Sequence, residues 1–479
     1  MSTIRKFAKN TMSWAAAWSV QPVINFIWMI IVTRALDKDL FGQYTIIFQF
    51  YYIFEITSSM GLKFLLTREV AVHRNLTRKY LKNGLILAFP SALINIAVLI
   101  AAVKIMGYEG LVEQGLYIIS IALIGTSFTD IFSAVLSGIE EVRKTAYSWI
   151  IFLLINTTAS IILLSLGYSV IALTISFVIA KFIHAIINYL YIPKDIPAED
   201  ARIDFKLWKE LLKETWSLAL LNINISLFWR IDTVLLSRMV SDEQVGTYGA
   251  AFRIFWFTLF TVRGFIIAFF PMVSTMFQYE NQKFQIACRK AMRYLTIIIL
   301  PIVLVLCFYS PEVILLVFGK KYFDSIIVFQ VMIWALLPYA ITEIFSTALV
   351  ASNQQKQQLI LSTINVVVKT VACYFLILHY GIMGPAIATI VALLISVAMQ
   401  KIVVIPKLIN LHIKSVIVPG IKVLAAALLM LTSIYLMRNF NLIVGAILAS
   451  LTYTVILLGL RIFSEDDKFY LRKVLKKTS

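Results

Sequence analysis

Charged side chains interrupt the long apolar stretches of this sequence, where water cannot solvate them. The basic ones are Lys63, Lys181, Arg230, Arg253, Arg263, Lys369 and Lys422, and the acidic ones are Glu55, Asp130, Asp232 and Glu343. A lone charge at the centre of a bilayer costs at least ~2.5–3.5 kcal/mol on insertion scales, so these groups should pair or face a wet cavity. The surplus is basic, and arginine in particular suits phosphate oxygens. The set therefore predicts a cationic cavity for an anionic ligand.

Helix geometry narrows the roles of four of these residues. Arg230 and Asp232 are two residues apart, so they point to different faces of one helix and cannot pair with each other. Asp232 and Arg253 lie equally far from a turn predicted near Asp242. We therefore predict an ion pair between Asp232 and Arg253 across a helical hairpin. Arg230 and Arg263 then remain for the cavity.

The two halves of the sequence repeat each other. TRALDKDLFGQY and SRMVSDEQVGTY align without a gap, which pairs Gly42 with Gly246. A later block, TDIFSAVL, aligns with TEIFSTAL, so that Asp130 matches Glu343. The matching blocks keep their order and nearly the same spacing, which predicts two parallel repeats of six spans each. Two such bundles enclose a central cavity, and their rocking alternates access to it.

The repeat separates the charges into two classes. Those shared by both halves serve the scaffold or the gates, so Asp130 and Glu343 are inner-gate or packing candidates, with ion coupling as the alternative. Lys63, near the inner end of its span, is a further inner-gate or coupling candidate, with snorkelling to the membrane surface as its alternative. Charges without a counterpart in the other half are the better candidates for substrate binding, and each has an interhelical contact as its alternative. These are Arg230, Arg263, Lys181, Lys369 and Glu55.

The composition of the chain indicates an integral membrane protein. Apolar residues make up 60% of the 479 residues and charged residues 14%, and the mean hydropathy is +0.88. The apolar residues form blocks of about 20 to 26, long enough to span a hydrocarbon core, which predicts an all-α polytopic protein of about fourteen spans. The net charge of +18 is concentrated in alternate loops. That pattern places both termini in the cytoplasm and argues against nucleic acid as a partner.

The other features of the sequence fit this architecture. The cysteines Cys288, Cys307 and Cys373 and four scattered histidines predict no disulfide framework and no metal site. In FKLWKELLK, within the linker, basic and apolar residues fall on opposite helical faces, which predicts a helix on the anionic inner leaflet. The predicted regions are an N-lobe at 1–192, a cytoplasmic linker at 193–213, a C-lobe at 214–405, two extra spans at 406–462 and a basic tail at 463–479.

Several stretches resemble a known family. WRIDTVLLSRMVSDEQVGTYGAAFRIF (229–255) resembles the seventh-to-eighth-span signature of bacterial and archaeal polysaccharide flippases. TRALDKDLFGQYTIIFQF (33–50), LLVFGKKYFDS (315–325) and HYGIMGPAIATI (379–390) are similar to further stretches of that family. The family is the polysaccharide transporter branch of the multidrug, oligosaccharidyl-lipid and polysaccharide exporter superfamily. Only the signature positions Arg230–Asp232 and Gly246–Tyr248 carry over residue by residue.

The resemblance implies a fold and an activity. The fold is two six-helix lobes in a V, as in MATE transporters, with two further helices beside a lipid-facing groove. The activity is transfer of a polyprenyl-diphosphate-linked oligosaccharide from the inner to the outer leaflet of the plasma membrane, without catalysis and without a cofactor. Coupling to a proton or sodium gradient is left open. Expected partners are the anionic lipid-linked oligosaccharide, membrane lipids, and the polysaccharide polymerase and export machinery.

Four alternatives compete with this interpretation. A drug exporter of the same superfamily would favour an acidic cavity for cationic drugs, whereas the surplus here is basic. A peptidoglycan-precursor flippase is the second, and the sequence resembles it less. A membrane glycosyltransferase or polymerase would need a sizeable extramembrane domain, for which the loops are too short. A non-transporting scaffold gives no account of the buried charges.

Overall fold

The computed structural model describes residues 24–59, 61–196, 202–408, 413–436 and 442–460, and within these ranges the chain forms helices and no strands. Nine helical stretches among the described residues are long and apolar enough to cross a membrane. Shorter apolar helices cover Ile24–Ala35, Ile421–Leu436 and Val444–Gly459. The all-helical membrane fold is confirmed. The count of fourteen spans remains a prediction, because the first predicted span begins outside the described residues, as does the basic tail.

Contacts between residues divide the chain into two compact units. Unit 1 is Met1–Arg253 with Ser362–Pro385, and unit 2 is Ile254–Leu361 with Ala386–Ser479. The long helices α10 (Asp242–Tyr279) and α15 (Gln355–Tyr380) each contribute residues to both units. The units are defined by compactness, whereas the predicted lobes are defined by the sequence repeat. The lobe boundaries therefore remain a prediction.

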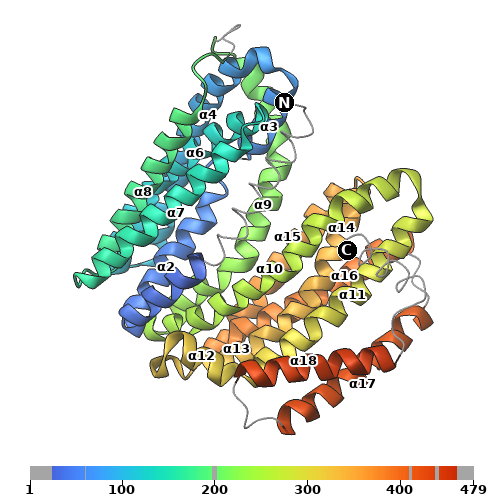
Figure 1. Cartoon of the computed structure of the whole chain (residues 1–479). Helices are drawn as coiled ribbons and strands as arrows, with labels where there is room; N and C mark the ends of the chain where they lie inside the picture. Colours follow the sequence, from blue (N-terminus) through green and yellow to red (C-terminus); the bar gives the residue numbers. More distant parts are fainter. Residues whose placement is uncertain (1–23, 60, 197–201, 409–412, 437–441, 461–479) are drawn as a thin grey trace. The chain divides into compact units, whose positions relative to one another are not determined.

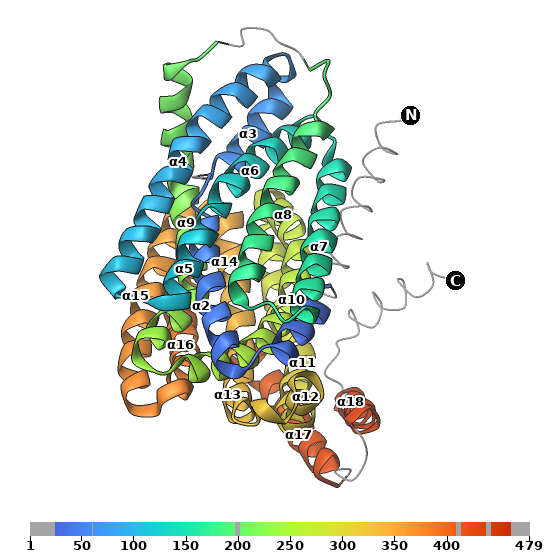
Figure 2. The same cartoon turned by 90° about the vertical axis from the view of Figure 1, so that its left-hand side faces the viewer.

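Unit 1 is built around a central helix, α6. Its helices are α2 (Lys38–Glu55), α3 (Leu62–Val72), α4 (Thr77–Met106), α5 (Gly110–Ser120), α6 (Ala122–Gly138), α7 (Val142–Ser165), α8 (Val170–Tyr191) and α9 (Phe205–Met239). Helix α6 contacts α3, α4 and α8, and Figure 2 shows α4, α6, α8 and α7 running side by side. Small residues on α6 allow close approach. A Cβ at Gly125 would lie 3.2 Å from the Lys181 backbone.

The span predicted near residues 42–66 is broken inside unit 1. Helix α2 ends at Glu55, and α3 begins after Gly61, whose φ of 74° is left-handed. Backbone that leaves a helix at membrane depth must find partners within the protein. Here the Ser127 hydroxyl lies 3.1 Å from the Ser58 carbonyl oxygen and 3.0 Å from that of Ala88. The break is thus supported by α4 and α6, and it divides one predicted span into two helices.

The start of α9 corrects the prediction of a helix lying on the membrane surface. Helix α9 is continuous from Phe205 to Met239 and packs against α3 and α4. Leu211 is buried in a cluster with Leu66, and the Trp208 indole nitrogen donates to Asn83 Oδ1 at 2.7 Å. An amphipathic pattern predicts that one face of a helix contacts an apolar surface, but it does not show whether that surface is lipid or protein. Here the protein covers Leu211 and contacts Trp208, whereas Phe205 is 73% and Leu212 41% exposed.

Asp204 caps α9, and its contacts predict a pH-dependent stability. Its Oδ1 accepts from the Lys206 and Leu207 N–H groups at 3.0 Å, and its Oδ2 lies 2.9 Å from Lys79 Nζ. The hydrogen bond from Lys79, with the two backbone N–H groups, lowers the pKa of Asp204. A lowered pKa means stability that is present above the ordinary value of about 4 and is lost as the pH falls through the folded-state pKa.

We therefore expect Asp204→Asn to have a lower melting temperature than the wild type at pH 7, and the difference to shrink below about pH 4. Asparagine still caps a helix, so the comparison isolates the link to Lys79. Asp195→Asn, an exposed change in the same linker, is the control and should leave the melting temperature unchanged at both pH values. A difference for Asp204→Asn that is the same at pH 7 and pH 3.5 would contradict the prediction.

Two glycines matched by the sequence repeat pack directly against each other in unit 1. A Cβ on Gly42 of α2 would lie 1.8 Å from the Asp242 carbonyl oxygen, and one on Gly246 of α10 would lie 2.4 Å from the Lys38 carbonyl oxygen. Lys38 Nζ meets Glu243 Oε1 at 3.1 Å beside them. The first turns of α2 and α10 therefore meet backbone to backbone, at a contact between equivalent positions of the two repeats.

Unit 2 contains α11 (Asn281–Phe308), α12 (Ser310–Phe318), α13 (Ser325–Met332), α14 (Leu336–Ala351), α16 (Gly384–Leu408), α17 (Ile413–Leu436) and α18 (Leu442–Gly459). Helices α17 and α18 lie against each other, as Figure 1 shows, and both contact α11. Ala426 and Met430 of α17 share a core with Leu300 and Leu304 of α11. The Tyr453 hydroxyl of α18 donates to the Ile297 carbonyl oxygen at 3.2 Å. The two C-terminal helices are thus fixed to one helix of unit 2.

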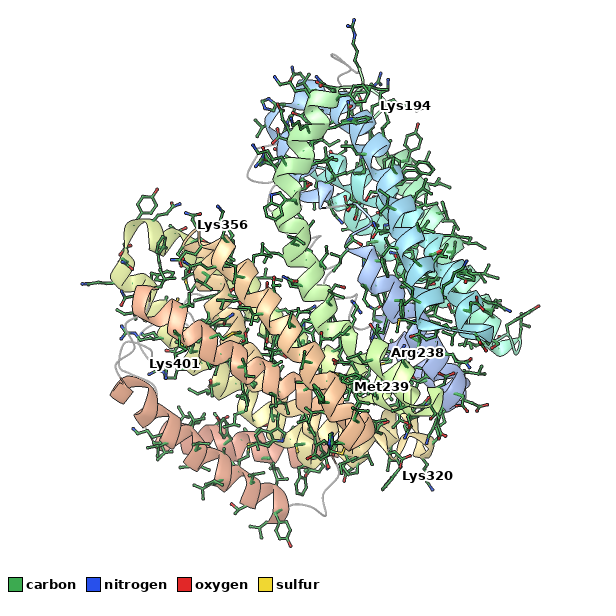
Figure 3. All side chains as sticks on the ribbon, turned by 180° about the vertical axis from the view of Figure 1, so that it is seen from behind. Lys194, Arg238, Met239, Lys320, Lys356 and Lys401 are labelled. Carbon is green, nitrogen blue, oxygen red and sulfur yellow. The ribbon has the colours of Figure 1, made fainter. Side chains whose placement is uncertain are left out.

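Basic side chains mark both ends of each helical unit. In unit 1, Lys194 lies at one end of the helices and Arg238 at the other (Figure 3). In unit 2, Lys356 and Lys401 lie at one end and Lys320 at the other (Figure 3). These pairs are the ones that the loop charges place on opposite sides of the membrane. That these ends face opposite sides of the membrane, as the loop charges predict, remains a prediction.

Candidate functional site

Asp232 of α9 forms its ion pair with Lys369 of α15. Lys369 Nζ lies 3.0 Å from both carboxylate oxygens, and the Tyr248 hydroxyl donates to Oδ2 at 2.7 Å. The side chains of Lys369 and Asp232 are 0% and 1% exposed. The Lys369 ammonium also donates to the Phe228 carbonyl oxygen. Each charge is fully enclosed and fully partnered, which favours a structural role for Lys369 over direct binding of a ligand.

The predicted pair between Asp232 and Arg253 is therefore wrong. The Arg253 guanidinium lies 4.5 Å from the Phe41 ring centroid and 5.1 Å from that of Tyr44, both on α2. Equal distance from the hairpin turn fixes only the depth of two residues, and not the face of the helix from which each projects. Tyr248, closer to the turn, reaches Asp232 in place of Arg253 because its ring spans the difference in depth.

Arg230 projects from a different face of α9, as its spacing from Asp232 predicts. Its Nη1 donates to Gln49 Oε1 at 2.7 Å, and its guanidinium carbon lies 4.6 Å from the Tyr52 ring centroid. Both Arg230 and Tyr52 are only partly buried. A partly exposed guanidinium in the middle of an apolar helix requires a wet or ligand-filled neighbourhood. Arg230 is thus a partly buried basic group of unit 1 that lies against an amide and an aromatic ring.

Glu55 and Lys181, predicted as separate cavity residues, are paired with each other. Lys181 Nζ lies 3.0 Å from Glu55 Oε1, and the two side chains are 4% and 28% exposed. The Tyr51 hydroxyl donates to the same Glu55 oxygen at 3.0 Å and lies 2.6 Å from Thr126 Oγ1. The pair connects the end of α2, at the break of the span, with α8. Only the carboxylate side of this pair is accessible.

Lys63 and Asp130, both predicted for an inner gate, also meet. Lys63 Nζ of α3 lies 2.9 Å from Asp130 Oδ1 of α6, and the Ser59 hydroxyl donates to Oδ2 at 2.9 Å. The Lys63 side chain is 46% exposed. An ion pair with one exposed partner opens and closes at little cost, because water replaces the lost contact. Such a pair suits an element that changes its contacts.

In unit 2, the repeat-matched acid Glu343 has a comparable neighbourhood. Tyr339 of α14 lies within hydrogen-bonding reach of both Arg263 and Glu343, and Arg263 interacts electrostatically with Glu343. The Arg263 guanidinium lies 4.4 Å from the Trp256 ring centroid. Asp130 and Glu343 thus each have a basic neighbour. The alignment matched the acids but not Lys63 with Arg263, because these fall outside the ungapped blocks.

The sequence reasoning concentrated on charges and missed the neutral residues that hold them. Gln49, Tyr51 and Tyr52 of α2 contact three of the candidate charges, and Tyr248 and Tyr339 contact three others. The sequence of α2 contains a pattern that could have indicated these residues, because its aromatic residues recur at helical spacing. No group of three or more histidine, cysteine, aspartate and glutamate residues among the described parts of the chain could hold a metal ion.

Comparisons with known proteins place this arrangement in a family. Residues 7–277 match the family described as Polysaccharide biosynthesis protein, and residues 212–455 match the family described as Lipid II flippase MurJ. The probable low-salt glycan biosynthesis flippase Agl15 of Haloferax volcanii is 22% identical over 67% of this chain and 67% of its own length. A putative O-antigen transporter of Shigella flexneri is 22% identical over 81% of this chain and 94% of its own length.

Solved structures share the fold. A structure of the lipid II flippase MurJ in an inward closed conformation has a TM-score of 0.75 and 17% identity, covering 92% of this chain and 97% of that one. An inward-facing multidrug resistance MATE transporter of the MOP superfamily has a TM-score of 0.66 and 15% identity, covering 80% and 94%. The first family match spans more than half of the 479 residues. The chain belongs to the polysaccharide biosynthesis protein family.

Proposed function

We propose that the protein is a flippase for a polyprenyl-diphosphate-linked oligosaccharide, which it moves from the inner to the outer leaflet by alternating access. Two observations support this proposal. The chain belongs to a polysaccharide biosynthesis family, and two relatives are named as a glycan biosynthesis flippase and an O-antigen transporter. The long apolar helices make it a multi-pass membrane protein.

The contact that carries the proposal is Arg230 on Tyr52. A guanidinium forms charge-assisted hydrogen bonds to phosphate oxygens, and a tyrosine ring with an adjacent amide offers the apolar and polar surfaces that a sugar needs. Arg230, Tyr52 and Gln49 supply these three groups from α9 and α2. Arg263, held against Trp256, is the corresponding candidate of unit 2. The substrate is thus proposed as an anionic glycolipid.

The membrane setting follows from the loop charges. We place the end of unit 1 that carries Lys194 in the cytoplasm and the end that carries Arg238 outside, in the plasma membrane of a bacterium or archaeon. We assign the pair Lys63–Asp130, together with Glu343, to the inner gate. The flipped unit would pass to the polysaccharide polymerase and export machinery at the outer leaflet. Transport changes no covalent bond.

A peptidoglycan-precursor flippase is the second candidate function. The match of residues 212–455 to the MurJ family and the structural similarity to MurJ favour it. Both substrates present a diphosphate, so the Arg230 site fits either one. The O-antigen-type relative covers more of this chain than the MurJ-family match, which favours the oligosaccharide.

Depletion of the protein in its host separates these functions. Under the proposed function, the polyprenyl-linked oligosaccharide accumulates in the inner leaflet, where an external glycosidase or lectin cannot reach it, while peptidoglycan synthesis continues. Accumulation of the peptidoglycan precursor instead would establish the second candidate. Undisturbed export of every surface glycan, together with normal peptidoglycan, would refute both.

Arg230→Ala should reduce transport about 10-fold or more, because it removes a charge-assisted hydrogen-bond donor from the substrate. Transport by Arg230→Lys should lie between that of the wild type and that of Arg230→Ala, since lysine keeps the charge but lacks the planar guanidinium. Transport is measured by surface glycan in a depleted host at matched protein levels. Arg238→Ala is the matched control, because Arg238 also stacks on a tyrosine ring, at 5.3 Å from Tyr108, but lies exposed at the end of α9. Equal losses for Arg230→Ala and Arg238→Ala would remove Arg230 from the site.

A further inference from the structure

The surroundings of the Lys181 ammonium have the composition of a cation-binding site. Its nitrogen lies 5.5 Å from the ring centroid of Tyr51, 5.6 Å from Trp149, 4.9 Å from Phe152 and 5.5 Å from Phe177. These rings come from α2, α7 and α8. Aromatic faces attract cations through their quadrupole, and a cage of such faces is a recurrent way of recognising alkylammonium groups. Lys181 is 3% exposed, so the cage is closed around it.

A carboxylate completes the site. Glu55 Oε1 lies 3.0 Å from the Lys181 nitrogen, and the Tyr51 hydroxyl donates to the same oxygen. Tyr51 is itself held by Thr126 Oγ1 at 2.6 Å. The acid is therefore positioned by α2 and α6, independently of the lysine.

Lys369, which is also buried, lies over two rings, 4.3 Å from the centroid of Phe228 and 5.6 Å from that of Trp229, whereas Lys181 lies over four. Lys369 touches both oxygens of Asp232, and neither side chain is exposed by more than 1%. Lys181 touches a single oxygen of a carboxylate that remains 28% exposed. The Lys181 ammonium is therefore buried, while the Glu55 carboxylate that it contacts is partly accessible to solvent.

We infer that unit 1 contains a site for a monovalent primary ammonium, formed by Glu55 and four aromatic rings, which the chain fills with its own Lys181. The tether gives this internal cation a high effective concentration, so a free cation cannot compete with it. Lys181 then links α2, α7 and α8 in the way that a bound ion would. This site is additional to the proposed substrate contacts, and binding to it can be measured without transport.

Lys181→Ala tests the inference, because it removes the atoms of n-propylammonium and leaves the rings and Glu55 in place. We expect n-propylammonium chloride at millimolar concentrations, compared with potassium chloride at equal ionic strength, to raise the melting temperature of this variant saturably by about 2 °C or more. The wild type should not respond. Neutral 1-propanol should have no effect on Lys181→Ala, and Lys181→Ala/Glu55→Gln should lose the response.

Arg143→Ala is the matched control, since Arg143 of α7 also lies over a ring, 4.9 Å from Tyr147, but is not enclosed. It should show no response to n-propylammonium. Melting is followed in crude detergent extracts by the loss of monodisperse protein on heating. If Lys181→Ala aggregates on extraction, its yield should be restored by n-propylammonium present from membrane preparation onward. An absent response, an equal response to 1-propanol, or one that survives Glu55→Gln would overturn the inference.

Discussion

Asp232→Ala is expected to destabilise the protein by about 3–5 kcal/mol, because it leaves the ammonium of Lys369 buried without a carboxylate. Lys369 is 0% exposed, so it cannot turn toward water while its helix stays in place. The Phe228 carbonyl oxygen and the nearby rings remain, but none of them carries a negative charge. The measurement is the free energy of unfolding, or the melting temperature, of the purified protein in detergent.

A double replacement separates the loss of a pair from the presence of an unpaired charge. Asp232→Leu/Lys369→Met fills a similar volume without any charge and should recover most of the stability. Arg74→Ala is the control for a surface pair. Arg74 and Glu140 form an ion pair whose side chains are 52% and 49% exposed, and breaking it should change stability by less than about 1 kcal/mol. If Asp232→Ala were no worse than Arg74→Ala, the enclosed pair would have no structural role.

Gly42→Ala is expected to have an effect of comparable size, about 4–5 kcal/mol, although it adds a single methyl group. The new Cβ would lie 1.8 Å from the Asp242 carbonyl oxygen, and a backbone atom cannot move aside as a side chain can. Helices α2 and α10 would have to separate at their first turns. Gly246→Ala should behave similarly, because its Cβ would lie 2.4 Å from the Lys38 carbonyl oxygen.

Gly264→Ala is the matched control for this pair. Gly264 lies on the same helix α10, and a Cβ there would meet no atom of the described residues within 4 Å. Alanine favours helix by about 1 kcal/mol over glycine, so this change should be neutral or slightly stabilising. Melting temperatures of the three variants in detergent measure the difference. Equal melting temperatures for Gly42→Ala and Gly264→Ala would mean that the two helices do not meet at this contact.

The contact between Gly42 and Gly246 joins positions that the internal repeat makes equivalent. Gly42 and Gly246 are aligned in the sequence, and each approaches the backbone of the other's segment. Polar contacts flank them, from Lys38 to Glu243 and from Gln43 Nε2 to Asp242 Oδ2 at 3.0 Å. When equivalent positions of two parallel repeats meet, the local symmetry axis passes between them. Glycine at both positions is required because neither has room for a Cβ.

Some of the candidate site was predictable because it rests on local geometry. The spacing of Arg230 and Asp232 placed them on different faces of α9, and the structure gives them different partners. The identity of those partners was not predictable. Lys369 is far from Asp232 in sequence, and the Asp232–Arg253 prediction failed because depth in the membrane says nothing about rotation around the helix axis. Pairing between distant helices depends on that rotation.

The break between α2 and α3 is a second feature that the sequence did not predict. Hydropathy predicts one span over this region, since the apolar content does not change where the helix ends. The break depends on polar groups of other helices, such as Ser127 and Asn95, which meet the backbone at Ser58 and Thr57. These groups come together only when α4 and α6 pack beside it.

The sequence by itself determined that this protein is a helical membrane protein, which of its loops carry the basic charge, that its halves repeat, and which residues carry charge within the apolar stretches. These are properties of composition and of local periodicity, and each can be evaluated without knowing which helices meet. Only the tertiary structure decided that Lys181 and Lys369 are enclosed with their own acids while Arg230 remains partly exposed. That outcome depends on how each helix is rotated and on which neighbour it packs against, because a charge inside a membrane protein is neutralised by whichever opposite charge the packing brings within reach.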